Sequence, residues 1–445
     1  MNEDLVSGGI YSDLLNQFEI ILDSDPLIDE VGFIHPSQFA TLNAEAGSSL
    51  TTSDSNSLQC IDVANQENAS FWVRDHKLGI STHVLLPLYK AAKHAFMSAL
   101  VQHKVLENPL ETSGDKSNLL QFSSSCNSIE SKVMRHSRAL ILLSCDFGTA
   151  WNSRKLIVSK QQHMSTFIDE LLFSGLVLSY SPKSEQAWCH RRWVIKMIAQ
   201  KCSALEEIVR KESELVEQIA ERSKMNYRAW NHRCWLVSYM TREQVLHELM
   251  KSRKWAGLHV ADSSCFHFRT RLLQRILADS CHELEDKVSD IRLEIDKIWQ
   301  EELDWNETLI KRYVGREALW LHRRFLSLFW LRLLETGVRF SQHKSSIAAN
   351  TISTFLDNEL CLANSSSSIP DNDYEDFQAQ AFHSTTYILW LTKQVPKSQR
   401  IKLGKNLRAG SLKTVLNVAC PERCSLWDEL IGYLEASDQG LEETA

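Results

Sequence analysis

The sequence predicts an all-α fold, an α-solenoid in which helical hairpins stack on one another. Three observations predict it. The 445 residues include only 15 glycines and 8 prolines, fewer turn-forming residues than a β-rich or α/β chain needs. From residue 85 onward, apolar residues recur at helical spacing, as in LLPLYKAAKHAFMSALVQHKVL. The motif W-x-x-R recurs at intervals that are typical of an array of helical repeats.

The chain is expected to begin with a weakly structured segment, residues 1–75, that includes a polar linker. Its stretch TLNAEAGSSLTTSDSNSLQ is rich in small and polar residues, a composition typical of flexible linkers. The hairpin solenoid is predicted over residues 76–361. Within it, ENPLETSGDKSN is expected to form a loop, because Pro, Gly, Ser and Asn cluster there.

Five segments of the solenoid carry the repeated motif. In each, an aromatic residue is followed three positions later by an arginine: Trp151 and Arg154, Trp188 and Arg191, Trp230 and Arg233, Phe266 and Arg269, and Trp320 and Arg323. The spacings between the aromatic residues are 37, 42, 36 and 54 residues. The longest interval is expected to contain one long amphipathic helix, within residues 279–313.

Each repeat is predicted to be a hairpin of an outer and an inner helix. In the second repeat, QHMSTFIDELLFSGLVLSY predicts the outer helix and SPK the turn. The inner helix is expected to start near Ser184, with Glu185 at the positive end of the helix dipole. After the array, the serine-rich stretch at 362–373 predicts a flexible linker, and residues 374–445 are expected to hold C-terminal helices.

Composition and charge exclude several classes of function. The net charge of −7 opposes a general role in nucleic-acid binding, which needs a basic face. The eleven cysteines form no C-x-x-C pair, so we expect reduced thiols and no metal site in this chain. The acidic N-terminus lacks the positive region of a secretory signal, and no apolar run is long enough to span a membrane. A cytoplasmic protein is therefore expected.

The repeated Trp and Arg residues are predicted to be structural. They lie on one face of each inner helix, where Trp is expected to fill the groove between hairpins, and Arg or His to link the helix to an adjacent loop. A packing residue occurs in every repeat, whereas a catalytic residue usually occurs once. Candidate functional residues are therefore those that differ between repeats.

Lys183, Tyr227 and Arg228 are such residues, because they precede or begin the inner helices of two successive repeats. Stacking of the hairpins would bring the two turns close together. A lysine, an arginine and a tyrosine hydroxyl at helix starts could bind a phosphate or diphosphate. The alternative is that Lys183 and Arg228 are ordinary solvated turn residues.

The segments QAWCHRRWVI and YRAWNHRCWLV resemble the α-subunit repeats of the heterodimeric protein prenyltransferases over residues 140–335. The strings DFGTAWN and KWAGLHVADSSCFHFR resemble a branch of repeat-containing proteins beside the farnesyl- and Rab geranylgeranyltransferase α subunits. The resemblance implies a right-handed, TPR-like crescent that wraps around a separate β subunit. It also implies that the β subunit supplies the zinc ion and most of the isoprenoid pocket, and that this chain holds no cofactor.

The resemblance further implies roles for individual residues. Pro182 and Lys183 match the start of the family motif P-K-N-Y, whose lysine is catalytic, while Ser184 and Glu185 depart from it. The motif N-Y-H-A-W matches residues 226–230, with Arg228 in place of His. Lys183 would then act in catalysis and, with Tyr227 and Arg228, bind the diphosphate.

The expected function is that of an α subunit, inactive alone, of a protein geranylgeranyltransferase. With a Rab-type β subunit it would transfer the lipid from geranylgeranyl diphosphate to a C-terminal cysteine of a protein. The alternative is a scaffold for protein–protein interaction that keeps the repeat and has lost the chemistry. A helical array that binds RNA or DNA is a third possibility, which the net charge opposes.

Overall fold

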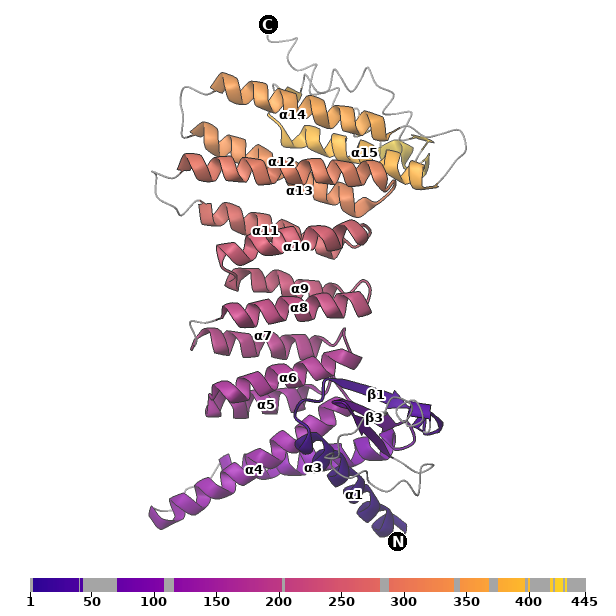
Figure 1. Ribbon diagram of the computed structural model, residues 1–445, viewed down its shortest axis with the longest axis vertical. Helices are drawn as coiled ribbons and strands as arrows, with labels where there is room; N and C mark the ends of the chain where they lie inside the picture. Colours follow the sequence, from indigo (N-terminus) through magenta and orange to yellow (C-terminus); the bar gives the residue numbers. More distant parts are fainter. Residues whose placement is uncertain are drawn as a thin grey trace, which may run out of the picture. The chain divides into compact units, whose positions relative to one another are not determined.

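A computed structural model describes most of the chain, and helices dominate it (Figure 1). The residues described are 3–39, 41–42, 70–107, 116–201, 205–280, 288–339, 345–367, 375–396, 399–400, 417–418, 421–426 and 429. The chain divides into two compact units, residues 1–232 and 233–445, and each is described by itself. Among the described residues, no helix has both the length and the apolar character needed to cross a membrane.

The first unit contains the predicted repeats of Trp151 and Trp188 and the first part of the inner helix of Trp230. Its helices are α1 (Glu3–Ser24), α3 (Leu85–Glu107), α4 (Lys116–Leu143), α5 (Gly148–Gln161), α6 (Met164–Tyr180), α7 (Glu185–Ala199), α8 (Glu206–Arg222) and the start of α9 (Tyr227–Leu236). Helix α4 packs on α5 and α6 packs on α7, as expected for hairpins. As predicted, α7 begins at Glu185, and the Ser184 side chain caps it by accepting a hydrogen bond from the Ala187 amide.

The second unit continues the array. It holds the end of α9, a 3₁₀ turn at Val237–Tyr239, and then α10 (Arg242–Leu258), α11 (Ser263–Ser280), α12 (Val288–Arg312), α13 (Glu317–Arg339), α14 (Ser345–Ser366), α15 (Glu375–Gln394) and a short 3₁₀ turn at Pro421–Arg423. The pairs α10/α11, α12/α13 and α14/α15 pack as hairpins (Figure 1). Helix α12 is the long helix predicted in the widest interval, with 25 residues.

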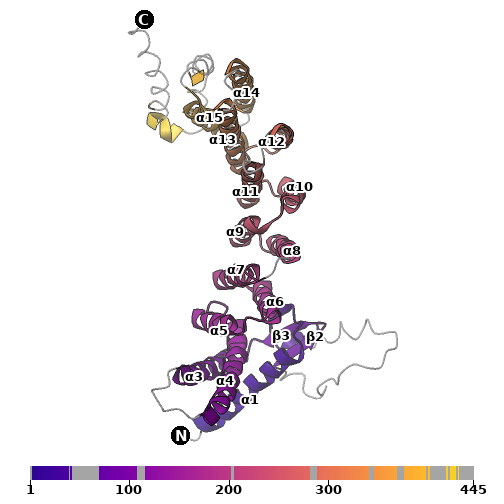
Figure 2. The ribbon, with the colours of Figure 1, turned by 90° about the vertical axis from the view of Figure 1, so that its left-hand side faces the viewer.

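The N-terminal region corrects the prediction of weak structure over residues 1–75. Besides α1 it contains a sheet of β1 (Glu30–Ile34), β2 (Phe71–Arg74) and β3 (Lys77–Ser81), in the order β1-β3-β2. Strand β1 pairs parallel and β2 antiparallel with β3. Strand β1 lies beside α6 (Figure 1), and Figure 2 shows β2 and β3 side by side. Phe18 of α1 and Ile80 of β3 are buried in one core with α3, so burial of apolar side chains orders this region.

Two predicted loops fall largely outside the described residues. The polar stretch TLNAEAGSSLTTSDSNSLQ spans residues 41–59, of which 43–59 lie outside the described residues. ENPLETSGDKSN spans residues 107–118, of which 108–115 lie outside them, and its described ends belong to α3 and α4. The boundary predicted at 362 is wrong, because α14 continues to Ser366 and buries Leu362 and Ala363. These two apolar side chains hold the helix to its neighbours in spite of the adjacent serines. Helix α15 confirms a helix within residues 374–445.

Candidate functional site

The repeated aromatic residues are core residues, as predicted. Trp151, Trp188, Trp230, Phe266 and Trp320 lie on the inner helices α5, α7, α9, α11 and α13, and each is at most 3% exposed. The indole of Trp188 packs against the imidazole of His232, with 4.9 Å between ring centroids. Its Nε1 donates a hydrogen bond to the Pro182 carbonyl at 3.0 Å, so the same side chain also holds the turn before its helix.

The repeated arginines bind buried glutamates on helices, which corrects the prediction that they link to loops. Arg191 donates from Nε to Glu212 of α8 at 2.6 Å and from Nη1 to the Leu171 carbonyl of its own hairpin. The corresponding pairs join Arg154 to Glu170, Arg233 to Glu248, Arg269 to Glu302, and Arg323 to Glu359. Each arginine thus ties its hairpin to the outer helix of the next one.

A histidine binds the same glutamate in three of these sets. His190 Nε2 lies 2.8 Å from Glu170, and the distances are 3.0 Å for His232 with Glu212 and 2.9 Å for His322 with Glu302. In all three, the histidine follows the glutamate by 20 residues. We call each set an Arg–Glu–His cluster. This constant spacing, with His one position before the repeat arginine, is the signal from which the glutamates could have been predicted.

In the other two sets, a different aromatic residue takes the place of the histidine. Phe268 occupies the histidine position beside Arg233, whose guanidinium lies 4.7 Å from the phenyl ring. At Glu359 the place of histidine is taken by Tyr387 of α15, whose hydroxyl donates to the carboxylate at 2.5 Å. The repeating element is therefore the Arg–Glu pair, while the third member is an aromatic ring.

Burial and pairing set the protonation of the clusters. Burial opposes ionisation of Glu170 and Glu212, but the adjacent Arg and His residues lower the pKa of each to about 2. Burial lowers the pKa of His190 despite its bond to Glu170. Its Nδ1 has no hydrogen-bond partner among the described residues, so protonation would leave a buried N–H unpaired. The ring is therefore neutral and donates from Nε2.

Acidification is expected to lower the free energy of unfolding of the repeats that contain these clusters, in two stages. Below pH 6.5 the unfolded chain protonates its histidines while folded His190 and His232 stay neutral, so stability falls with pH. A second loss follows between pH 4.5 and about 2, where Glu170 is protonated in the unfolded chain but ionised in the fold. Urea unfolding at a series of pH values measures this; stability that is constant from about pH 7.5 to 5 would contradict the neutral histidines.

The three candidate functional residues lie together at the turn before α7. Arg228, at the start of α9, donates from Nη1 to the Lys183 carbonyl at 2.6 Å. Tyr227 is 61% exposed, and its ring lies 5.5 Å from the Arg228 guanidinium. The Lys183 side chain is exposed and makes no ion pair among the described residues. We call Lys183, Tyr227 and Arg228 the basic edge.

The turn itself is fixed from two sides. Besides Trp188, the buried Asn226 donates from Nδ2 to the Pro182 carbonyl at 2.8 Å. Asn226 also caps α9, because its Oδ1 accepts from the Ala229 amide at 3.2 Å. The position of Lys183 therefore follows from the packing of two successive repeats.

Carboxylates border the basic edge, a feature that the sequence patterns did not predict. Glu185 accepts from Arg228 at 2.9 Å and from Arg192 at 3.0 Å. Burial opposes its ionisation, but hydrogen bonds from the Cys189 thiol and the two arginines lower its pKa. Asp146 accepts from the Ser184 hydroxyl at 3.1 Å. The residues named at this turn carry three positive charges, on Lys183, Arg192 and Arg228, and two negative charges, on Glu185 and Asp146. The net charge of the turn is therefore positive, which can attract an anion.

A family model describes three segments of the array. The protein prenyltransferase alpha subunit repeat matches residues 167–198, 209–240 and 299–329. These three segments of the chain are therefore similar to that repeat. The first two matches include the inner helices α7 and α9, and they contain the residues of the basic edge: Lys183 lies in the first, and Tyr227 and Arg228 lie in the second. The resemblance predicted from the motif is confirmed.

Of three curated relatives, two carry the name of this repeat and one is named as a transferase subunit. A Danio rerio protein named protein prenyltransferase alpha subunit repeat-containing protein 1 is 31% identical over 53% of this chain and 63% of its own length. The Homo sapiens protein of the same name is 30% identical over 46% and 60%. The geranylgeranyl transferase type-2 subunit alpha of Saccharomyces cerevisiae is 22% identical over 38% and 52%. The chain therefore matches less than two thirds of the length of each relative.

Proposed function

We propose that this chain is the α subunit of a heterodimeric protein geranylgeranyltransferase that acts in the cytoplasm. The observation that carries the proposal is the contact of Lys183, in one matched repeat, with Arg228, in the next matched repeat. An exposed lysine beside an arginine and a tyrosine hydroxyl at two helix starts provides the donors that a lipid diphosphate requires.

In the proposed reaction a substrate cysteine sulfur forms a bond to C1 of the prenyl group. The C1–O bond breaks, and its electron pair leaves with the diphosphate. Zinc, expected in the β subunit, would supply the cysteine as a thiolate. The role of this chain is to stabilise the leaving group: the Lys183 ammonium would contact the diphosphate oxygens on which negative charge develops. Arg228 would hold the opposite side of the diphosphate.

Glu185 limits the contribution of Arg228 to diphosphate binding. Its carboxylate already binds Arg228 and Arg192, and it would repel an incoming diphosphate. Lys183 is the cation of the edge without such a carboxylate partner in the described residues. The proposal therefore assigns the main contact to Lys183 and a smaller one to Arg228.

The second candidate is a non-catalytic scaffold, which the Arg228–Glu185 ion pair and the departures at Ser184 and Glu185 favour. Affinity purification of the tagged full chain from cells separates the two. We expect a prenyltransferase β subunit to co-purify, and the heterodimer to transfer geranylgeranyl to cysteine-terminated peptides while the chain alone is inactive. A heterodimer that forms but transfers no lipid to any such peptide would favour the scaffold.

A further inference from the structure

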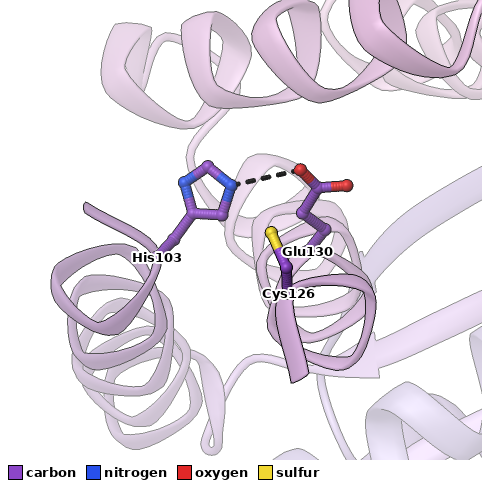
Figure 3. A group of neighbouring side chains, drawn as sticks. All are labelled: His103, Cys126 and Glu130. Atoms are coloured by element: carbon purple, nitrogen blue, oxygen red, sulfur yellow. Dashed lines mark hydrogen bonds and ion pairs between the residues drawn. The ribbon is translucent and has the colours of Figure 1, made fainter. Parts of the chain in front are cut away.

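A second cluster of chemically reactive side chains lies in the first unit, away from the proposed diphosphate contact. His103 of α3 meets Cys126 and Glu130 of α4 (Figure 3). Cys126 and Glu130 are four residues apart and so lie on one face of their helix, facing His103. No two of the three donor atoms are more than 4.8 Å apart. Sequence motifs did not indicate this set, because the residues are not in a C-x-x-C pattern.

We propose that His103, Cys126 and Glu130 bind a zinc ion that joins α3 to α4. Imidazole nitrogen, thiolate sulfur and carboxylate oxygen are the three ligand types that zinc uses in proteins. His103 is 2% and Glu130 7% exposed, so both are withdrawn from water, whereas Cys126 is partly exposed. A water molecule that enters from the exposed side would complete the tetrahedron.

The His–Glu contact is a long hydrogen bond, and its length also fits two ligands of one metal ion. His103 Nε2 and Glu130 Oε1 are 3.4 Å apart, longer than the usual N–H···O separation of about 2.7–3.2 Å. Two ligands of a tetrahedral zinc ion, each about 2.0–2.2 Å from the metal, lie about 3.3–3.5 Å apart. Small rotations of the Cys126 and Glu130 side chains would close the remaining distances.

The charges around Glu130 fit both a metal-free state and a zinc-bound state. Lys160 of α5 lies with Nζ 3.2 Å from Glu130 and compensates the carboxylate in the structure. Zinc binding would release the Cys126 thiol proton, and the thiolate and the Glu130 carboxylate would then neutralise the metal charge. The Lys160 side chain is 42% exposed and can turn into water when the metal replaces it.

Titration of the metal-free full-length chain with Co²⁺ and then Zn²⁺ tests the proposal. We expect one equivalent of cobalt to produce a thiolate-to-cobalt absorption band and tetrahedral d–d bands, and zinc to displace it. Cys126→Ser should abolish the band and weaken zinc binding by about 100-fold or more, since losing a residue that only orients a ligand costs about 10- to 100-fold. Cys361→Ser, which removes an exposed thiol of the second unit, is the matched control and should keep the band.

Lys160→Gln separates a metal site from a purely structural polar cluster. Removal of the competing ammonium should strengthen zinc binding several-fold, whereas a cluster that needs Lys160 only for charge balance would lose stability without gaining metal affinity. Absence of the thiolate band in the wild-type chain, or its persistence in Cys126→Ser, would overturn the proposal. Circular dichroism confirms that each variant is folded.

Discussion

Glu212→Ala is expected to lower the free energy of unfolding of the first unit by about 3–5 kcal/mol. Glu212 is buried and accepts hydrogen bonds from both Arg191 and His232. Removing the carboxylate leaves the Arg191 guanidinium buried without its counter-charge and His232 without its acceptor. The cost of an uncompensated buried charge exceeds the loss of the pair itself. Urea unfolding of the full chain, followed by tryptophan fluorescence, measures the change.

Glu214→Ala is the matched control, because this residue lies on the same helix in an exposed ion pair with Arg210. Exposed pairs of this kind contribute about 0–1 kcal/mol, so the control should unfold close to wild type. If both variants unfold alike, the Arg–Glu–His cluster does not hold the repeats together. A triple variant, Glu212→Leu with Arg191→Met and His232→Phe, should recover most of the stability, because apolar residues of similar size can replace a buried ionic cluster.

The sequence predicted the repeat array because its signals are local. The aromatic residue and the arginine of each motif are three positions apart on one helix, so their common face follows from helical geometry alone. The glutamates are different. Glu170 lies beside Asp169, and Glu212 shares its helix with five other glutamates, so only the 20-residue spacing to the next histidine distinguishes the two residues. That spacing depends on hairpin length, which a single repeat does not show.

The N-terminal sheet was missed for a related reason. Strands β2 and β3 have only 4 and 5 residues, too few for a clear alternation of apolar and polar positions. Strand β1 pairs with β3, although Glu30 and Lys77, which face each other in the register, are far apart in sequence. Such pairing depends on a core that α1 and α3 build together, and no local pattern encodes it.

The basic edge was predicted in part. The turn before α7 was recognisable from its proline and from Ser184 as a helix cap, so Lys183 was placed correctly in a turn. The approach of Arg228 to Lys183 followed from the expected stacking of hairpins. The ion pair of Arg228 with Glu185 did not, because it joins residues 43 positions apart whose charges look like solvated surface groups. Tertiary packing converts them into neighbours.

Lys183→Ala is expected to slow prenyl transfer by the purified heterodimer by about 10²- to 10³-fold in kcat, with a smaller effect on KM for the lipid diphosphate. The contact strengthens as charge develops on the leaving group, so its loss affects the transition state more than the bound substrate. The side chain is exposed in the structure, so removing it should leave folding and heterodimer formation intact. Single-turnover assays with a cysteine-terminated peptide measure the chemical step.

Lys224→Ala is the matched control for that variant, because Lys224 is an exposed lysine in the corresponding turn of the next hairpin. It removes the same charge from the chain without changing the basic edge. A general electrostatic attraction of the lipid would make the two variants equal, and both would lose activity as salt rises. A specific contact with the leaving group would slow Lys183→Ala alone. Unchanged turnover in Lys183→Ala would remove this residue from the reaction and leave the edge a structural turn between two repeats.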